Sequence, residues 1–471
     1  MRPFRIAITL VLAAIVALCA RKLASVSVER APERSTLLAA DAIDPERIDL
    51  VEIVRGDVLH RFERRADGWW QTEPIVHAAD SWSMRQLAQR ALKVESVRRV
   101  ELSTDESPDA AAQTLAGAGL APPAGRFRLS ETGADARPAK TVEIELGRRG
   151  LAGRAFARVV TGGIATREAQ AAHSFDVIDG TLHEFALERA ATEYRRKELF
   201  PTVSEIDRVE LAAGAATIAV VRRGRTFSVE APIKTRADRE ACAELFDAIK
   251  RARSAAFVID APSDLSVYGL SPPAATLRVS GPNGDGVLAI GAPVAMGSQD
   301  RFALVEGTTS VVRVPATTLA GIAPRADRLI DATATDARSS DVGAIDIRLG
   351  DTLLAIRREV DGWRATETAP DGAMREGSVD LSAVERLLSA LDATRATAIE
   401  IAAFPVERER AIVTLRGFAG EVIETVRVAS DRAGGGTGDG LLLENGDGVL
   451  RRHGAIDFPV TAEDLGFAPR S

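Results

Sequence analysis

The chain has few of the residues that carry redox and metal chemistry. Its 471 residues include two cysteines and five histidines. Cys19 lies in an apolar N-terminal run, which leaves Cys242 as the single cysteine of the body. One thiol cannot close an intrachain disulfide or supply a cysteine metal cluster. We therefore predict no disulfide, no metal and no cofactor.

Aromatic residues are scarce as well, at 4%, and acidic residues outnumber basic ones, giving a net charge of -7. Phosphate binding requires a basic face, so nucleic acid is not expected as a partner. The sequence contains no GxxxxGK[ST], HExxH or Gly-x-Ser-x-Gly motif. No residue is therefore predicted to be catalytic, and the chain is not expected to be an enzyme.

The remaining candidates for chemistry are weak. His173 and His183 stand ten residues apart, a poor spacing for zinc, and we expect both at the surface. Asp176, Asp179 and Glu184 lie nearby, but an acid site needs a second carboxylate at a defined distance. We expect these three to be solvated loop charges.

The N-terminus differs from the rest of the chain. Residues 6–20 carry no charge and are flanked by Arg5 and Arg21, the pattern of an export signal. A helix of this length spans about 22 Å, short of the ~30 Å hydrocarbon core, and the flanking basic residues could make up the difference by snorkelling. We predict that residues 1–28 form an uncleaved single-pass anchor in the cytoplasmic membrane, with residues 6–20 in the lipid bilayer and a periplasmic body. The alternatives are a cleaved signal peptide and a lipoprotein acylated on Cys19.

The body contains an internal repeat, which is visible first in three similar openings. These are ERIDLVEI from Glu46, SEIDRVEL from Ser204 and GAIDIRL from Gly343. Each begins an alternation of apolar and polar residues, the period of a half-buried strand. The outward face of that strand is the simplest place for the recurring aspartate, and no acidic site is inferred.

A second strand, a turn and an aromatic residue follow each opening. The aromatics are Trp69, Phe227 and Trp363, and an Asp-Gly pair precedes the two tryptophans, which favours a tight hairpin. Phenylalanine in the middle copy argues against a role that only indole can fill. We predict that all three occupy one equivalent core position, and that Trp70 faces the opposite side.

A helix is predicted next in each copy, with Asp80, Asp238 and Asp380 as N-caps. Residues four, seven and eleven positions later should form its buried face. These are Met84, Leu87, Ala91, Cys242, Leu245, Ile249, Val384, Leu387 and Leu391. Cys242 is thus expected to be a small core residue and not a nucleophile.

Beyond the helix, two copies carry Gly-Leu-x-Pro-Pro and further strands, whereas the third has a glycine-rich loop from Ala433. We predict an α+β fold: an N-terminal membrane helix followed by three related units, each an antiparallel strand meander with one amphipathic helix. The expected boundaries are a linker at 29–45 and units at 46–203, 204–342 and 343–471, the last degraded.

The motif at Tyr268–Pro273, with Gly291 closing one strand and Arg301–Phe302 opening the next, resembles the domain-of-unknown-function 4340 family. The resemblance is best over 206–331 and good over 48–200. It implies a bacterial protein with one N-terminal membrane segment, often encoded beside an ABC-type transport system of the gliding-motility kind. The family has no assigned catalytic residues, so the resemblance transfers no site. It implies a membrane-anchored accessory of a transporter-like complex.

We therefore expect a non-enzymatic scaffolding or binding protein whose repeats present strand edges and loops to partners such as a transporter permease. A second hypothesis is an exported carbohydrate- or peptidoglycan-binding protein that uses Trp70 or Trp82 as a stacking platform. The third is a hydrolase with an unrecognised site. Low aromatic content weighs against the second, and the missing nucleophile and base pattern weighs against the third.

Overall fold

The structure is a computed structural model that describes residues 35–39, 42–102, 108–131, 139–161, 174–432 and 440–469. The predicted anchor, Cys19, His173 and most of the glycine-rich loop from Ala433 lie outside these ranges. Within them, no helix is long and apolar enough to cross a membrane. The prediction of an anchor at residues 6–20 is therefore not addressed by the described part of the chain.

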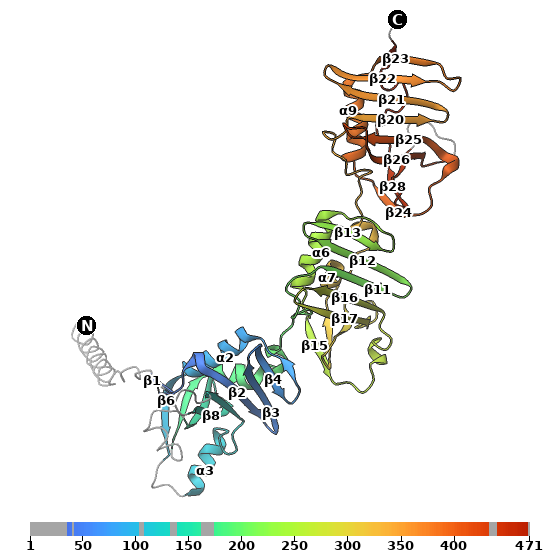
Figure 1. Ribbon diagram of the computed structural model, residues 1–471. Coiled ribbons are helices and arrows are strands. Elements are labelled where there is room, and N and C mark those ends of the chain that lie inside the picture. The colour runs from blue at the N-terminus through green and yellow to red at the C-terminus, as the bar shows by residue number, and fades with distance from the viewer. Residues whose placement is uncertain are drawn as a thin grey trace, which may run out of the picture. The chain divides into compact units, whose positions relative to one another are not determined.

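Three antiparallel sheets follow one another along the chain (Figure 1). The first sheet has ten strands, which lie across it in this order: β1 (Ser35–Thr36), β6 (Glu95–Glu101), β10 (Ser174–Asp179), β9 (Arg154–Thr161), β8 (Lys140–Arg149), β7 (Gly125–Glu131), β2 (Ile48–Arg55), β3 (Val58–Arg65), β4 (Gly68–Glu73) and β5 (His77–Ala78).

The second sheet has nine strands, and read from the corresponding edge its order is β15 (Ala256–Asp260), β19 (Ser310–Val314), β18 (Arg301–Val305), β17 (Gly284–Pro293), β16 (Ala275–Gly281), β11 (Arg208–Ala213), β12 (Ala216–Arg223), β13 (Thr226–Ala231) and β14 (Thr235–Arg236). The third sheet has ten, in the order β24 (Ala398–Ile401), β28 (Val449–His453), β27 (Leu441–Glu444), β26 (Val422–Ser430), β25 (Glu409–Arg416), β20 (Ala344–Leu349), β21 (Thr352–Glu359), β22 (Gly362–Thr368), β23 (Met374–Ser378) and β29 (Ala468–Pro469).

The three sheets share one topology over nine strands. In each, the chain forms four neighbouring strands, passes through a helix, and resumes in a strand on the opposite side of the sheet. The next four strands then fill the sheet until the last pairs with that strand. In the first sheet the short strand β1 adds to its outer side. The predicted α+β class and the repeat are confirmed. The strands β6, β15 and β24 were not predicted.

The long helix of each repeat begins at its predicted aspartate. The helices are α2 (Ser81–Leu92), α6 (Arg239–Arg251) and α9 (Leu381–Asp392). Each capping carboxylate accepts a hydrogen bond from a first-turn amide, and the acceptor to donor distances are 2.8 Å for Asp80 and Ser83, 2.9 Å for Asp238 and Ala241, and 3.1 Å for Asp380 and Ser382. Each cap satisfies an amide that the helix itself leaves unpaired.

The buried faces of these helices are also as predicted, because all nine residues of the expected face are buried. One further position was missed. The residue eight places after each cap is buried as well, and it differs in size between the repeats: Ala88, Phe246 and Leu388. Short helices complete the molecule: α3 (Pro108–Gly117) and α5 (Thr181–His183) in the first repeat, and α7 (Ala316–Ile322) and α8 (Ala326–Leu329) in the second.

The repeated aromatic position is a core position. Trp69 is 6% exposed and Trp363 is 5% exposed. Phe227 is partly buried, and its ring meets that of Phe246 edge-on at a centroid distance of 5.2 Å. The repetition of Asp-Gly-Trp therefore reflects one structural corner built more than once.

The Gly-Leu-x-Pro-Pro motif is a turn that only glycine can begin. Gly119 and Gly269 have φ angles of +71° and +63°, a region that side chains rarely adopt. A Cβ added to Gly119 would lie 2.8 Å from the amide nitrogen of Arg148, and one on Gly269 would lie 2.7 Å from that of Ala292. The motif thus brings the turn against the end of the β8 or β17 strand.

Contacts divide the chain into two compact units, Met1–Lys197 and Glu198–Ser471. The first unit contains the first sheet and its own core. The second unit contains the other two sheets, and the core of the second sheet includes Val449 and is packed by Ile399, both from the third sheet. Two repeats therefore form a single body in the second unit.

Candidate functional site: the joint between the second and third sheets

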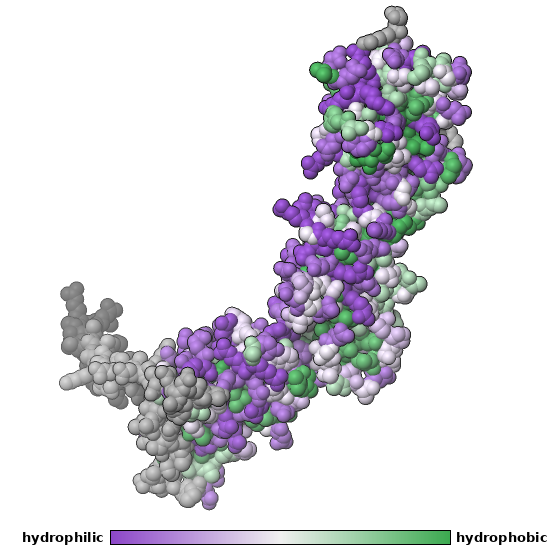
Figure 2. Space-filling view, in the orientation of Figure 1, coloured by the Kyte–Doolittle hydropathy of each residue, from purple (hydrophilic) through white to green (hydrophobic). Residues whose placement is uncertain are grey.

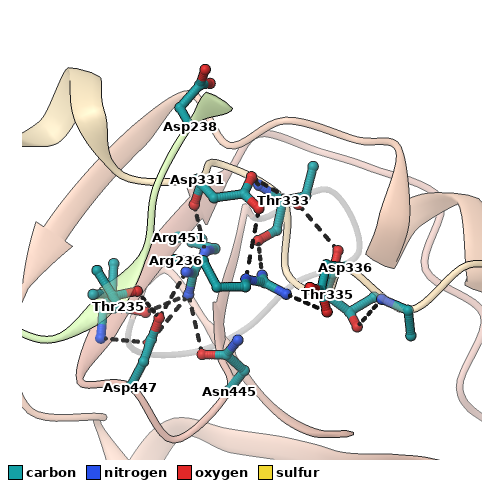
Figure 3. A network of polar contacts seen from close by, with 12 residues as sticks. Thr235, Arg236, Asp238, Asp331, Thr333, Thr335, Asp336, Asn445, Asp447 and Arg451 are labelled. Atoms are coloured by element: carbon teal, nitrogen blue, oxygen red, sulfur yellow. Dashed lines mark hydrogen bonds and ion pairs between the residues drawn. The ribbon is translucent and has the colours of Figure 1, made fainter. Parts of the chain in front are cut away.

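A cluster of charged side chains lies where the second and third sheets meet (Figure 3). The second repeat contributes residues from β14 and from the segment after α8, and the third contributes β26, β28 and the turn before β28. We call this cluster the polar joint; its residues are Thr235, Arg236, Asp331, Glu424, Asn445, Asp447 and Arg451.

Arg451 is the buried centre of the polar joint, with 0% of its side chain exposed. Its Nη2 donates to Oδ2 of Asp447 at 2.8 Å, and its Nε donates to the carbonyl oxygen of Asp331 at 2.9 Å. Oδ2 of Asp447 also accepts from Oγ1 of Thr235 at 2.5 Å. Burial alone would raise the pKa of Asp447, but the hydrogen bonds from Arg451 and Thr235 outweigh it and hold that pKa below its ordinary value.

Arg236 connects the same two repeats a short distance away. Its Nη2 donates to the carbonyl oxygen of Thr333 at 2.9 Å, and its guanidinium lies 3.6 Å from the carboxylate of Asp331 and 3.4 Å from that of Glu424. Glu424 accepts in addition from Nδ2 of Asn445 at 2.7 Å. Figure 3 shows Arg236 and Arg451 side by side among these oxygen atoms.

The helix cap of the second repeat takes part in the same junction. Asp238 caps α6 with one oxygen and pairs with Arg395 of the third repeat through the other. Burial would raise the pKa of Asp238, but the Ala241 amide and the Arg395 guanidinium lower it further than burial raises it. One aspartate thus stabilises the start of a helix and the contact between two sheets.

Apolar packing accompanies these charges. Val449 is fully buried in the core of the second sheet, although it belongs to β28 of the third. A Cβ added to Gly448 would lie 2.7 Å from Cδ1 of Ile233, so the end of the Ile233 side chain packs directly against the backbone of the third repeat. The junction is therefore a packed interior with internal ion pairs.

This arrangement is suited to holding two repeats together. Arg451 and Asp447, both of the third repeat, pair with each other and reach the second repeat through the carbonyl oxygen of Asp331 and the hydroxyl of Thr235. Removing either would leave a buried charge without its partner. An open cavity of about 420 Å³ beside the joint is lined by acidic side chains including Asp238, Glu240 and Glu244. Across the described residues, no group of three or more His, Cys, Asp or Glu side chains is arranged to hold a metal ion.

Two expectations about the weak candidates are wrong. His183 is buried, and its Nε2 lies 2.9 Å from the carbonyl oxygen of Gly147; burial lowers its pKa. Asp176 is buried in β10, and its Oδ1 accepts from Oγ of Ser96 at 2.6 Å. The sequence does not show that β10, which carries Asp176, lies between β6 and β9, nor that His183 of α5 packs against Gly147 of β8.

Other expectations are confirmed. Asp179 ends β10, and its Oδ1 accepts from the amide of Thr181 at 2.8 Å, while Glu184 is exposed. Cys242 is fully buried, and burial raises the pKa of its thiol to about 12, which is the opposite of what a nucleophile needs.

The aspartates of the repeated Ile-Asp openings face outward. Asp207 pairs with Arg222 at 3.1 Å, and Asp346 pairs with Arg416 at 2.6 Å. Each pair ties neighbouring segments of its own sheet.

The tryptophans of the carbohydrate-binding hypothesis are not in the core. Trp70 is half-buried, its Nε1 donates to Oδ1 of Asp67 at 2.9 Å, and the guanidinium of Arg65 stands 5.4 Å from its ring centroid. Trp82 is 63% exposed in the first turn of α2. One ring is thus already covered by an arginine, and the other stands alone in solvent.

Sequence reasoning missed the polar joint. Its partners are far apart in the chain: 120 residues separate Arg451 from Asp331, and 212 separate Thr235 from Asp447. One local feature of the sequence pointed to it: Arg451 stands at a strand position whose side chain faces the core, and the second repeat has Val312 at that position. A charge at such a position indicates a buried partner.

Comparisons with known proteins give one family match and several distant structural likenesses. No curated protein matches the chain. Solved structures with some likeness include a DNA polymerase sliding clamp from Pseudomonas aeruginosa with ligand, at 9% identity and a TM-score of 0.14, covering 70% of this chain and 86% of that one. Another is a DNA polymerase III subunit beta from Borrelia burgdorferi, at 9% identity and a TM-score of 0.12, covering 93% and 94%. These TM-scores support no statement about fold or function.

The family match begins in β13 and ends in β26, so it includes α6, α9 and the second repeat's part of the polar joint. Over residues 228–427, the chain matches the model of the family described as domain of unknown function (DUF4340).

Proposed function

We propose that this protein is a non-enzymatic scaffold, anchored in the cytoplasmic membrane and serving as an accessory of an ABC-type transport system. The observation that carries the scaffold proposal is the polar joint. Three hydrogen bonds of the cluster cross from one repeat to the other: Arg451 donates to the carbonyl oxygen of Asp331, Thr235 donates to Asp447, and Arg236 donates to Glu424. The charged cluster therefore serves to fix two sheets together. A rigid pair of sheets suits a protein that presents surfaces to partners.

One edge of the second sheet is the surface that we propose for the partner. Val258 and Ile259 of β15 are 44% and 39% exposed, at the end of the strand order. The equivalent strand of the first sheet, β6, differs in two ways: Arg98 and Arg99 stand where β15 has Ala256 and Phe257, and the short strand β1 pairs with it. Charged side chains and a covering strand both protect an edge from further pairing. Figure 2 shows hydrophobic residues on the visible face in the region where Figure 1 labels β15 and β17.

The proposed occupant is an extended apolar segment of a membrane-embedded transporter subunit, added to the sheet as a strand. Strand addition gives affinity through the main chain and specificity through alternate side chains. A membrane anchor at residues 6–20 would hold the chain at the same membrane as such a subunit.

The binding proposal is tested by photocrosslinking in native membranes. A photoreactive phenylalanine derivative at position 258 should capture a membrane-embedded transporter subunit. The same derivative at Val360, an apolar residue that is 109% exposed in a turn of the third sheet, is the matched control. Equal capture from both positions would contradict the proposed edge.

The location proposal is tested separately. After a carbonate wash the protein should stay in the membrane fraction, and its N-terminal sequence should begin at or near Met1. Recovery of a soluble protein that begins after Ala20 would overturn the anchor without affecting the docking edge.

A further inference from the structure

The first repeat contains a pocket of about 260 Å³ between α2 and the β3–β4 hairpin. Its floor is made by the buried side chains of Ile48, Trp69, Met84 and Ala88. The pocket lies within the unit Met1–Lys197, whereas the polar joint belongs to the unit Glu198–Ser471. No part of the scaffold proposal depends on it.

The repeats themselves show why this space is empty of side chains. Ala88 occupies the position that holds Phe246 in the second repeat and Leu388 in the third. In the second repeat the ring of Phe246 packs edge-on against Phe227, which is the counterpart of Trp69. The first repeat therefore has the aromatic floor but lacks the ring that would cover it.

The rim of the pocket is basic. Arg64, Arg65 and Arg85 line it, against the one carboxylate of Glu46. The guanidinium of Arg65 also stands over the ring of Trp70, and Nη1 of Arg64 donates to the carbonyl oxygen of Glu46 at 2.9 Å. Arg85 is exposed and forms no ion pair with any described residue. Its counterpart is Ala243 in the second repeat and Glu385 in the third, so the combination of a gap and a cationic rim belongs to the first repeat.

We propose that this pocket binds a small aromatic anion, with the ring against Trp69 and the charge among the guanidiniums of the rim. An aromatic ring fits because edge-to-face packing is what the second repeat builds at the same place. A carboxylate, sulfonate or phosphate suits the rim because guanidinium groups pair with these anions through charge-assisted hydrogen bonds. The volume suits a ligand of one or two rings.

The test uses the full chain labelled with ¹⁵N-tryptophan and titrated with 1-naphthalenesulfonate. The indole resonance of Trp69 should shift on binding, whereas that of Trp363 should not, because Leu388 fills the equivalent place in the third repeat. The neutral analogue 1-naphthalenemethanol should bind at least about fivefold more weakly, the size expected for one charge interaction at a partly exposed site.

Two variants copy the other repeats. Ala88→Leu should weaken binding by at least about tenfold, because the added side chain occupies the ring's place, and should leave the melting temperature unchanged or higher. Arg85→Glu should weaken binding by about fivefold and remove most of its salt dependence, with no change in folding because the side chain is exposed.

Three results would overturn the proposal: a shift of Trp363 as large as that of Trp69, equal affinity for the neutral analogue, or unchanged affinity in folded Ala88→Leu. Should Ala88→Leu fail to fold, the Arg85→Glu titration and the neutral analogue decide the matter. An unchanged affinity in Arg85→Glu would then exclude the basic rim as the anion site.

Discussion

The first unit contains one repeat, and the second unit contains two repeats that share a core. Comparing them shows which residues join one repeat to the next. At the start of the joint, the second repeat has Arg236 in its short edge strand and Asp331 in the segment that leaves it. The first repeat has Ala78 and Arg196 at the corresponding places. The ion pair between Arg236 and Asp331 therefore has no counterpart in the first repeat.

The residues that the third repeat contributes to the polar joint also differ from their counterparts in the second repeat. Asp447 and Arg451 of the third repeat correspond to Thr308 and Val312 of the second. A few substitutions thus distinguish a repeat that fuses with its successor from one that forms a compact unit alone. All three repeats therefore share one topology, and a small set of charged residues determines which of them pack together into one unit.

The largest expected effect comes from breaking the buried pair at the joint. Arg451→Ala should cost about 3–5 kcal/mol, because it leaves the carboxylate of Asp447 buried without its partner. It should also separate the unfolding of the second and third repeats into two transitions, measured by calorimetry. Arg452→Ala is the matched control: that side chain is 37% exposed and pairs with Glu400 and Asp431, both within the third repeat. The loss should be about 1 kcal/mol, and the two repeats should still unfold in one transition.

Truncating a core side chain should lower the free energy of unfolding by nearly as much, and should show which repeats unfold together. Leu245→Ala, on the buried face of α6, should cost about 2–5 kcal/mol through lost transfer energy and a cavity. Because the second and third repeats share a core, the change should lower the melting of both and leave the first unit unaffected. Glu244→Ala, its exposed neighbour, should change stability by less than about 0.5 kcal/mol. Equal effects of the two changes would refute the assigned face.

Acid sensitivity should be concentrated in the third repeat at mildly acidic pH. His453 is buried at a position held by Val314 in the second repeat, and burial, with Arg451 nearby, lowers its pKa from 6.5 to about 4. Since the unfolded chain binds the proton more readily, the stability present above about pH 6.5 should fall by about 3 kcal/mol as the pH drops to 4.

His453→Val should abolish that loss between pH 6.5 and 4, as followed by urea unfolding at a series of pH values. The loss from joint carboxylates such as Asp447, whose pKa is lowered from 3.8, should persist below that window. A His453→Val protein with unchanged sensitivity at pH 5 would show that another group is responsible.

The smallest expected loss of stability comes from replacing the tryptophans after the Asp-Gly turns, which tests whether Trp69 and Trp363 occupy equivalent positions. Trp363→Phe should cost about 1–2 kcal/mol through lost volume, since Phe227 fills the same position in the second repeat. Trp69→Phe should cost no more than Trp363→Phe if the two corners are alike, because the pocket beside Trp69 already leaves space. A larger cost at Trp69 would show that the two corners are not equivalent.

Much of the repeat could be predicted because it depends on interactions between residues that are close in the sequence. The caps at Asp80, Asp238 and Asp380 and the spacing of apolar residues on the helices are properties of a few turns of chain, and the structure confirms them. The same holds for Trp363, whose burial follows from its place after an Asp-Gly turn. Repetition strengthened these inferences because three copies had to agree.

What could not be predicted depends on contacts between distant segments. The edge strand β15 carries no clean alternation, because a bulge between Phe257 and Ile259 shifts its register. The polar joint joins residues from two repeats, and no spacing rule connects Arg236 to Glu424 across 188 residues. The pocket beside Trp69 could have been suspected from Ala88 standing in line with Phe246 and Leu388, but only the structure shows that nothing else fills the gap.

The central claim is that the second and third repeats form one cooperative body, separate from the first. Hydrogen exchange of the full chain in increasing denaturant tests it most directly, by comparing peptides from α2, α6 and α9. The account predicts that α6 and α9 open with the same free energy and the same denaturant dependence, that α2 opens with its own, and that Arg451→Ala makes α6 and α9 diverge. Different opening energies for α6 and α9 in the unaltered protein, with α6 matching α2, would contradict it.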